Sequence, residues 1–233
     1  MRVPRALWVL AALLLSTPFA KADSTTMQFT GVNGANNGVY YVSPYAGTMN
    51  YGTSSAQSVV LFCDDINNEV SFNQVWTANV ISLASGNFTS TRYGNASVNT
   101  GLSTNPYASS AAVLYQEAAW LVTQFSSHPG DYVSLQYALW NLMSPNNSNA
   151  GSLAYQNSDG ITVASWLQMA GLYYATINPA NFLIITNTGP LAYTGQVQEF
   201  FVVTTPEPAT FLLVLVGVGW MFLFLCRRHP LST

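Results

Sequence analysis

Cys63 is the residue best suited to covalent chemistry, because it is the single cysteine between residues 23 and 205. A thiolate is a strong nucleophile that can attack a carbonyl carbon. With one thiol, this part of the chain cannot form an internal disulfide. Two interpretations remain: Cys63 is a small buried hydrophobic residue at the end of the apolar run 59–63, or it is a reactive group.

Gln136 is the second residue of interest, because it lies in an apolar segment. Residues 132–143 predict a helix that is apolar on nearly all sides and is therefore buried. Leu139, Trp140 and Met143 follow Gln136 at helical spacing on the same face. A carboxamide in such surroundings needs a polar partner.

These motifs resemble the thioester domain of Gram-positive surface adhesins. The resemblance rests on Cys63 followed by Asp65, on Ala-Ala-Trp-Leu at 118–121, and on the Gln-x-Ala-x-Trp motif that begins at Gln136. In that family, a cysteine on a strand and the glutamine of this motif form an internal thioester. The resemblance implies a thioester between Cys63 and Gln136, with Trp140 as its shield against water.

The residue types define the chemistry of such a bond. The thiolate attacks the carboxamide carbon, ammonia leaves, and a strained acyl donor remains. A surface amine or hydroxyl of a target can then take the acyl group from Cys63, which leaves a covalent amide or ester on Gln136. The segment 23–205 contains no lysine, so it has no lysine amine that could attack the thioester from within.

Two other residues compete for roles in this chemistry. Gln116 also begins a Gln-x-Ala-x-Trp motif, but the Ala-Ala-Trp-Leu helix precedes the reactive glutamine in the family, which favours Gln136. His128 could pair with Cys63 as in a cysteine hydrolase, whereas its Ser-Ser-His-Pro-Gly context is typical of a surface turn.

An acidic segment follows Cys63. Oxygens of Asp64, Asp65, Asn67 and Glu69 could bind Ca²⁺, but the spacing matches no EF-hand loop and a turn at 67–68 explains it as well. We expect the turn, and no metal or cofactor. The acids beside Cys63 predict a raised thiol pKa.

Composition excludes several functional classes. Arg92 is the single lysine or arginine in 23–205, against eight aspartates and glutamates, a formal charge of −7. Nucleic acids and anionic lipids need clustered basic residues, so neither is an expected partner. His128 is the single histidine of this segment, which excludes a histidine-cluster zinc site, and no hydrolase or phosphate-loop motif is present. We therefore do not expect an enzyme.

Hydrophobic patterns predict an α+β fold. Short apolar or aromatic runs at 27–30, 39–42 and 58–63, and a β-like stretch at 70–83, precede a polar loop at 85–105. Helical spacing follows at 109–125, at 132–143 with Asp131 as its N-cap, and at 161–177. Segments 182–186 and 196–203 return to strand character. The prediction is a β-rich scaffold with an insert of about three helices.

The N-terminus has the pattern of a signal peptide. Arg2 and Arg5 precede the apolar run 6–15, and Ala20 and Ala22 form a cleavage pattern before Asp23. The alternative is an uncleaved anchor, but this apolar run is too short to span a bilayer. The pattern therefore predicts that the protein is exported and that signal peptidase removes residues 1–22.

The C-terminus resembles the PEP-CTERM sorting signal of Gram-negative, exopolysaccharide-producing bacteria. Pro206, Glu207 and Pro208 precede the apolar segment 209–226, long enough to cross roughly 30 Å of hydrocarbon, and Arg227 and Arg228 stop transfer. In that family an exosortase cuts at or near the tripeptide. The alternative is an ordinary single-pass anchor.

The sequence therefore predicts a signal peptide at 1–22, an extracytoplasmic domain at 23–205 and a sorting tail at 206–233. The predicted protein passes through the inner membrane to the cell envelope, outer surface or matrix of a Gram-negative bacterium. Its predicted role is covalent adhesion through Cys63 and Gln136. The alternatives are a passive structural or polysaccharide-associated matrix protein and, least favoured, a cysteine-dependent enzyme.

Overall fold

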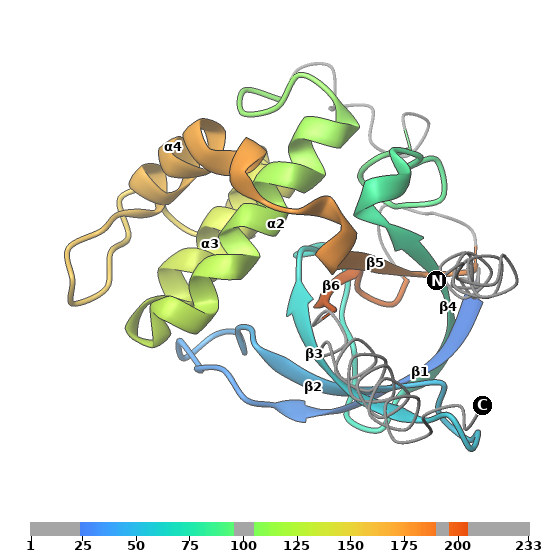
Figure 1. Ribbon diagram of the computed structural model, residues 1–233. Helices are drawn as coiled ribbons and strands as arrows, with labels where there is room; N and C mark the ends of the chain where they lie inside the picture. The colour runs from blue at the N-terminus through green and yellow to red at the C-terminus, as the bar shows by residue number, and fades with distance from the viewer. Residues whose placement is uncertain (1–23, 96–104, 190–195, 205–233) are drawn as a thin grey trace, which may run out of the picture.

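The computed structural model describes residues 24–95, 105–189 and 196–204. Its centre is a closed antiparallel barrel with the strand order β1-β2-β3-β6-β5-β4 (Figure 1). The strands are β1 (Ser24–Val32), β2 (Tyr45–Met49), β3 (Gln57–Cys63), β4 (Val75–Ser82), β5 (Phe182–Asn187) and β6 (Phe200–Val203).

Three α-helices lie between β4 and β5 in the chain and pack together on one side of the barrel (Figure 1). They are α2 (Ala111–Ser127), α3 (Tyr132–Met143) and α4 (Val163–Tyr173). Short 3₁₀ turns accompany them: η1 (Leu83–Ser85), η3 (Pro129–Asp131), η4 (Ser148–Ala150), η5 (Tyr174–Thr176) and η6 (Pro179–Asn181). The predicted β-rich α+β fold with a three-helix insert is confirmed.

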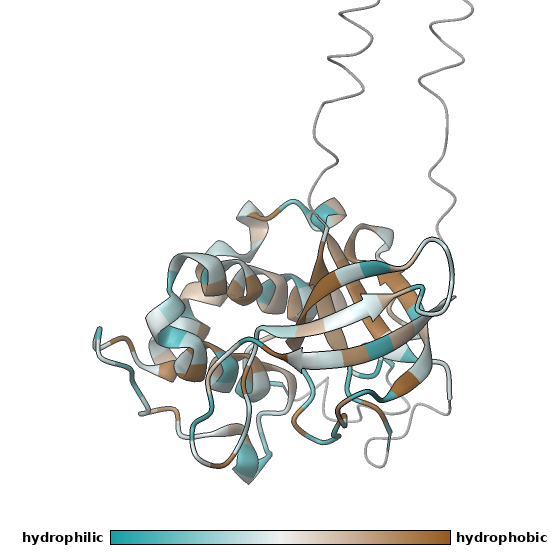
Figure 2. Ribbon diagram, turned by 90° about the horizontal axis from the view of Figure 1, so that it is seen from below, coloured by the Kyte–Doolittle hydropathy of each residue, from teal (hydrophilic) through white to brown (hydrophobic). Residues whose placement is uncertain are grey.

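The strands follow the two-residue period of a sheet with one buried face. In β1, Thr25, Met27 and Phe29 are buried while the residues between them are not. Bands of hydrophobic and hydrophilic residues accordingly run along the barrel strands in Figure 2.

The end of β3 is buried on both faces. Leu61 and Cys63 belong to the hydrophobic cluster that fills the barrel, whereas Phe62 belongs to the cluster that the helices form and packs edge-on against Phe125. Phe200 and Phe201 of β6 divide between the two clusters in the same way. The helices therefore cover the barrel wall at which Cys63 ends its strand.

Polar side chains set two of the helix starts. Ser110 accepts a hydrogen bond from the Val113 N–H at the start of α2, and Thr162 accepts one from the Ser165 N–H at the start of α4. Asp131 is the N-cap residue of α3, but its side chain makes no capping hydrogen bond. The predicted bounds of α3 and its N-cap position agree with the structure, although among the described residues no side-chain hydrogen bond from Asp131 caps the helix.

The predicted strand at 39–42 is also wrong, because these residues lie in the loop 33–44 between β1 and β2. The Asn37 side chain accepts hydrogen bonds from the N–H groups of Val39 and Tyr40, which fixes a turn in place of a strand. The strand β2 was missed, since Tyr-Ala-Gly-Thr-Met carries little strand signal. At its centre, a side chain on Gly47 would overlap Leu61.

The two ends of the chain lie outside the described residues. This applies to the signal peptide at 1–22 with Ala20 and Ala22, and to the tail at 206–233 with its Pro-Glu-Pro motif and arginines. Among the residues that the structure describes, no helix combines the length and apolar character needed to cross a membrane.

Candidate functional site

Cys63 ends β3 opposite Phe200 of β6, and its side chain is fully buried. The Sγ atom donates a hydrogen bond to the main-chain oxygen of Asp65, at 3.4 Å. Trp140 and Val133 of α3 lie in the same hydrophobic cluster as Cys63. The thiol therefore lies where the end of the barrel meets α3, out of contact with solvent.

Gln136 of α3 is also fully buried and is held against the main chain of Cys63. Its Nε2 donates to the Cys63 carbonyl oxygen at 2.6 Å, and its Oε1 accepts from the Ser43 N–H at 2.9 Å. The Ser43 hydroxyl accepts from the Cys63 N–H at 2.8 Å. Three segments distant in sequence are thus joined by a closed set of hydrogen bonds, and the structure brings together the two residues singled out in the sequence.

Trp140 lies one helical turn after Gln136 and is 1 % exposed. Its ring packs edge-on against Tyr40, with centroids 5.7 Å apart, and lies 6.1 Å from the ring of Tyr137. The Asn37 side chain donates to the Tyr137 hydroxyl at 2.7 Å. The loop 33–44 therefore covers this part of α3 through several contacts.

The surroundings of Cys63 keep its thiol protonated. Burial raises the pKa of Cys63 well above its ordinary value, and the Asp65 and Asp64 carboxylates raise it further. The hydrogen bond to the Asp65 main chain lowers the pKa of Cys63, but its effect is weaker. The acids do raise the pKa, as the sequence predicted, although burial is the larger cause.

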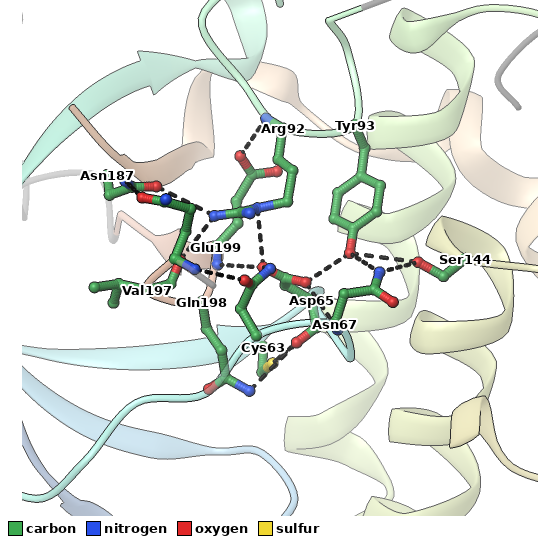
Figure 3. Close-up of polar contacts among 12 residues, drawn as sticks. Cys63, Asp65, Asn67, Arg92, Tyr93, Ser144, Asn187, Val197, Gln198 and Glu199 are labelled. Atoms are coloured by element: carbon green, nitrogen blue, oxygen red, sulfur yellow. Dashed lines mark hydrogen bonds and ion pairs between the residues drawn. The ribbon is translucent and has the colours of Figure 1, made fainter. Parts of the chain in front are cut away.

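Asp65 anchors a buried polar cluster next to Cys63 (Figure 3). Its Oδ2 lies 2.9 Å from Arg92 Nε, and both side chains are fully buried. Its Oδ1 accepts from the Tyr93 hydroxyl at 2.8 Å, and its Oδ2 also accepts from Asn68 at 2.8 Å. Sequence reasoning missed this role of Arg92, for which the isolated position of one cation in an acidic segment was the available signal.

Glu199 and Asp64 complete the cluster with contrasting environments. The Glu199 carboxyl group accepts a hydrogen bond from the main-chain N–H of Arg92 at 2.7 Å and another from the Tyr115 hydroxyl at 2.5 Å. Both carboxyl oxygens of Asp64 are buried, and among the described residues neither has a hydrogen-bond partner. Burial, followed by the charges of Glu199 and Asp65, raises the pKa of Asp64 well above its ordinary value.

The acidic segment after Cys63 forms a turn, as favoured from the sequence. Asn67 lies in the turn and donates its N–H to Asp65 at 3.0 Å, while Glu69 is exposed. Within the described ranges, no group of three or more His, Cys, Asp or Glu side chains is arranged to hold a metal ion. The carboxylate of Asp65 forms an ion pair with Arg92 instead.

The two competing residues lie in other surroundings. Gln116 is half-buried on α2, and within the described part of the chain its side chain makes no hydrogen bond to Cys63. His128 Nδ1 lies 3.2 Å from the Gln124 carbonyl oxygen, and its ring packs edge-on against Trp166 at a centroid distance of 5.1 Å. These contacts place His128 on the helical side, with no hydrogen bond between it and Cys63 among the described residues.

A pocket of about 380 Å³ adjoins the site, and Tyr40, Phe72, Trp140 and Gln198 are among the residues that line it. Gln198 Nε2 donates to the Asp65 carbonyl oxygen at 3.3 Å, and the Cys63 thiol donates to the same oxygen (Figure 3). The Asp65 carbonyl oxygen therefore connects Gln198 on the pocket wall to the thiol of Cys63. Among the described residues that line the pocket, Glu69 is the one that carries a charge.

Comparisons with known proteins gave one distant likeness. No protein-family model matches the chain, and no curated protein matches it. Among solved structures, it is similar to the N-terminal thioester domain of a surface protein from Clostridium perfringens, at 10 % sequence identity and a TM-score of 0.38. The match covers 78 % of this chain and 99 % of that one.

Proposed function

We propose that this protein is an exported surface or matrix protein that attaches covalently to its target through a thioester between Cys63 and Gln136. One observation carries the proposal. The Gln136 carboxamide is fully buried and hydrogen-bonded at 2.6 Å to the main chain of Cys63, whose thiol is the one free cysteine found in the described residues. This contact supports the proposal, because it joins the carboxamide to the residue that carries the buried thiol.

Thioester formation needs no additional reactant. The bond between Sγ and the carboxamide carbon forms, the bond between that carbon and Nε2 breaks, and the thiol proton leaves with the nitrogen as ammonia. A neutral thiol suits this balance, because the proton it carries is the one that the departing nitrogen needs. Burial of both groups, with Trp140 at 1 % exposure beside them, would keep water from hydrolysing the product.

The acyl group then passes to an external amine or hydroxyl. The bond from Sγ to carbon breaks, the acceptor forms an amide or ester with the former Gln136 side chain, and the acceptor's proton returns to Cys63. The pocket beside Trp140 is the proposed entrance, since Gln198 on its wall shares a hydrogen-bond acceptor with the thiol. Each chain reacts once, so the protein is not a turnover enzyme.

Export and sorting form the second part of the proposal. Signal peptidase would remove 1–22, the apolar segment 209–226 would hold the chain in the inner membrane, and an exosortase would recognise Pro206, Glu207 and Pro208. The mature domain would then reach the envelope, outer surface or matrix of a Gram-negative bacterium. The support is the order of motifs at the two ends of the sequence.

A passive matrix protein is the second candidate, and one observation favours it. Cys63 is completely buried in the barrel cluster with a pKa far above its ordinary value, as expected of a cysteine that serves as a small hydrophobic residue. In this case Gln136 would only satisfy the polar groups at the end of β3.

Intact mass spectrometry of the full chain distinguishes the two candidates. The thioester predicts that the wild type is lighter than its sequence mass, after any processing, by one ammonia, and that Cys63→Ala and Gln136→Ala are not. Gln116→Ala is the matched control and should keep the deficit. Iodoacetamide must be applied in denaturant, because a buried free thiol would also resist it in the folded chain.

A second assay tests acyl transfer. Methylamine should add to the wild type and to Gln116→Ala, with the adduct on the peptide that contains Gln136, and should not add to Cys63→Ala. A full wild-type mass, with Cys63 alkylated in denaturant and no methylamine adduct, would overturn the thioester and leave the matrix protein.

A further inference from the structure

The penultimate residue of the loop 33–44, Ser43, contacts both proposed reactants. Ser43 is fully buried, donates its N–H to Gln136 Oε1 at 2.9 Å, and accepts the Cys63 N–H on its hydroxyl at 2.8 Å. We propose that the Ser43 N–H stabilises the oxyanion in thioester formation and acyl transfer, and that the Ser43 hydroxyl positions it. This inference rests on the proposed thioester of Cys63 and Gln136.

The hydrogen bonds fix which end of the carboxamide faces which partner. The Ser43 N–H can only donate, and the Cys63 carbonyl can only accept. The Gln136 oxygen must therefore point to Ser43 and its nitrogen to Cys63. The atom that leaves as ammonia and the atom that gains negative charge are thus assigned by their neighbours.

The oxygen of Gln136 gains charge each time its carbon becomes tetrahedral. This happens when Sγ adds to the carboxamide, and again when the acceptor adds to the thioester. The donor lies 2.9 Å from the oxygen of the unreacted carboxamide, and its burial strengthens the interaction once that oxygen gains charge. One main-chain N–H can therefore serve both steps.

The Ser43 hydroxyl gives this N–H a fixed position. Its bond to the Cys63 N–H links the loop to the end of β3, so that the donor moves together with the nucleophile's own residue. Ser43 also precedes β2, which pairs with β3 along its length. The barrel therefore fixes the position of the Ser43 N–H, whereas α3 positions the Gln136 side chain that it contacts.

Two substitutions separate the donor from its positioning group. Ser43→Ala keeps the N–H and removes the hydroxyl, and Ser43→Thr keeps both. Replacement of the amide between Val42 and Ser43 by an ester, through incorporation of the hydroxy-acid analogue of serine, removes the N–H alone. Ser71→Ala, an exposed serine on the pocket wall, is the matched control.

The measurement is the rate of methylamine incorporation into the full chain, together with the fraction that carries the ammonia deficit. We expect the ester analogue to slow incorporation by about 10²–10³-fold. Ser43→Ala should slow it at least about tenfold under conditions in which the variant remains fully folded, with rescue by Ser43→Thr and no change in Ser71→Ala.

The outcomes are separable from those of the proposed function. A wild type without the ammonia deficit removes the thioester and this inference with it. A wild type that carries the deficit, together with an ester analogue that forms and transfers its thioester at the wild-type rate, overturns the role of Ser43 alone.

Discussion

Arg92 Nε lies 2.9 Å from the Asp65 carboxylate, and neither side chain has any exposure to solvent (Figure 3). Asp65 also supplies the carbonyl oxygen that accepts from the Cys63 thiol. Arg92 reaches further, to the Val197 carbonyl oxygen at 2.8 Å and to Asn187 at 3.2 Å. The ion pair therefore ties the segment that follows β3 to the segments around β5 and β6, and it holds the chain next to the site.

Arg92→Met should destabilise the fold strongly, because it leaves the Asp65 carboxylate buried without its cation. Breaking a buried pair from one side typically costs about 3–5 kcal/mol. The measurement is the free energy of unfolding from denaturant titration. The double variant Arg92→Met/Asp65→Asn should recover part of the loss, whereas equal stability of wild type and Arg92→Met would contradict the structural role assigned to the pair.

Glu117 predicts a dependence of stability on pH. It lies on α2 at 3 % exposure, and burial raises the pKa of Glu117 to about 7. Because the folded pKa exceeds the unfolded value, the folded state binds the proton more tightly. The resulting stabilisation is complete below about pH 4 and is lost as the pH rises through about 7.

Glu117→Gln should therefore change unfolding free energies differently at pH 5 and pH 8. Relative to wild type, the variant should gain stability between these values by up to about 3 kcal/mol, the most that a pKa shift of this size allows. Glu69→Gln, at an exposed position, is the matched control. Parallel pH profiles for wild type and Glu117→Gln would contradict the prediction.

The elements that sequence predicted best are those with a long periodic pattern. Segment 132–143 coincides with α3 because its apolar residues, with Pro145 beyond, leave little choice of start and end. The strand at 39–42 failed, since Tyr40 packs against Trp140 from a loop that Asn37 fixes. Tertiary packing overrode strand propensity there.

The parts of the site that depend on main-chain groups had no signal in the sequence. Cys63 and Gln136 are unusual residues for their apolar surroundings, so their types alone drew attention to them. Ser43 contributes an N–H group that every residue except proline possesses. Its importance follows from where β2 begins relative to Cys63, and Asp64 likewise shows its lack of partners only once the fold is known.

Trp140 should protect the thioester from water. Trp140→Ala would lower the free energy of unfolding by about 3–5 kcal/mol, so that a loss of reactivity could result from unfolding alone. Trp140→Phe is therefore the informative change. We expect the thioester to form in this variant but to hydrolyse faster, which converts position 136 to glutamate and frees Cys63. Peptide mass mapping over time measures this, with Trp120→Phe on α2 as the control. Equal lifetimes in all three chains would show that Trp140 is not the shield.

Gly34 links the packing of the loop 33–44 to the site. A side chain on Gly34 would overlap the main-chain oxygens of Val42 and Ser43, so Gly34→Ala must push these residues away. Overpacking of this kind costs about 1–3 kcal/mol. Ser43 holds Gln136 and Cys63 through hydrogen bonds. The rate of methylamine incorporation in Gly34→Ala should therefore fall by more than the loss of folded protein alone would cause.

Gly130→Ala is the control for this change, since within the described part of the chain nothing beyond its two sequence neighbours lies within 4 Å of an added Cβ there. It should leave both the unfolding free energy and the incorporation rate near wild type. If Gly34→Ala lowered stability while methylamine reacted at the wild-type rate, the position of Ser43 would not limit the reaction. A loss of rate in Gly34→Ala that tracks the loss in Ser43→Ala would instead connect the loop's packing to the chemistry through one residue.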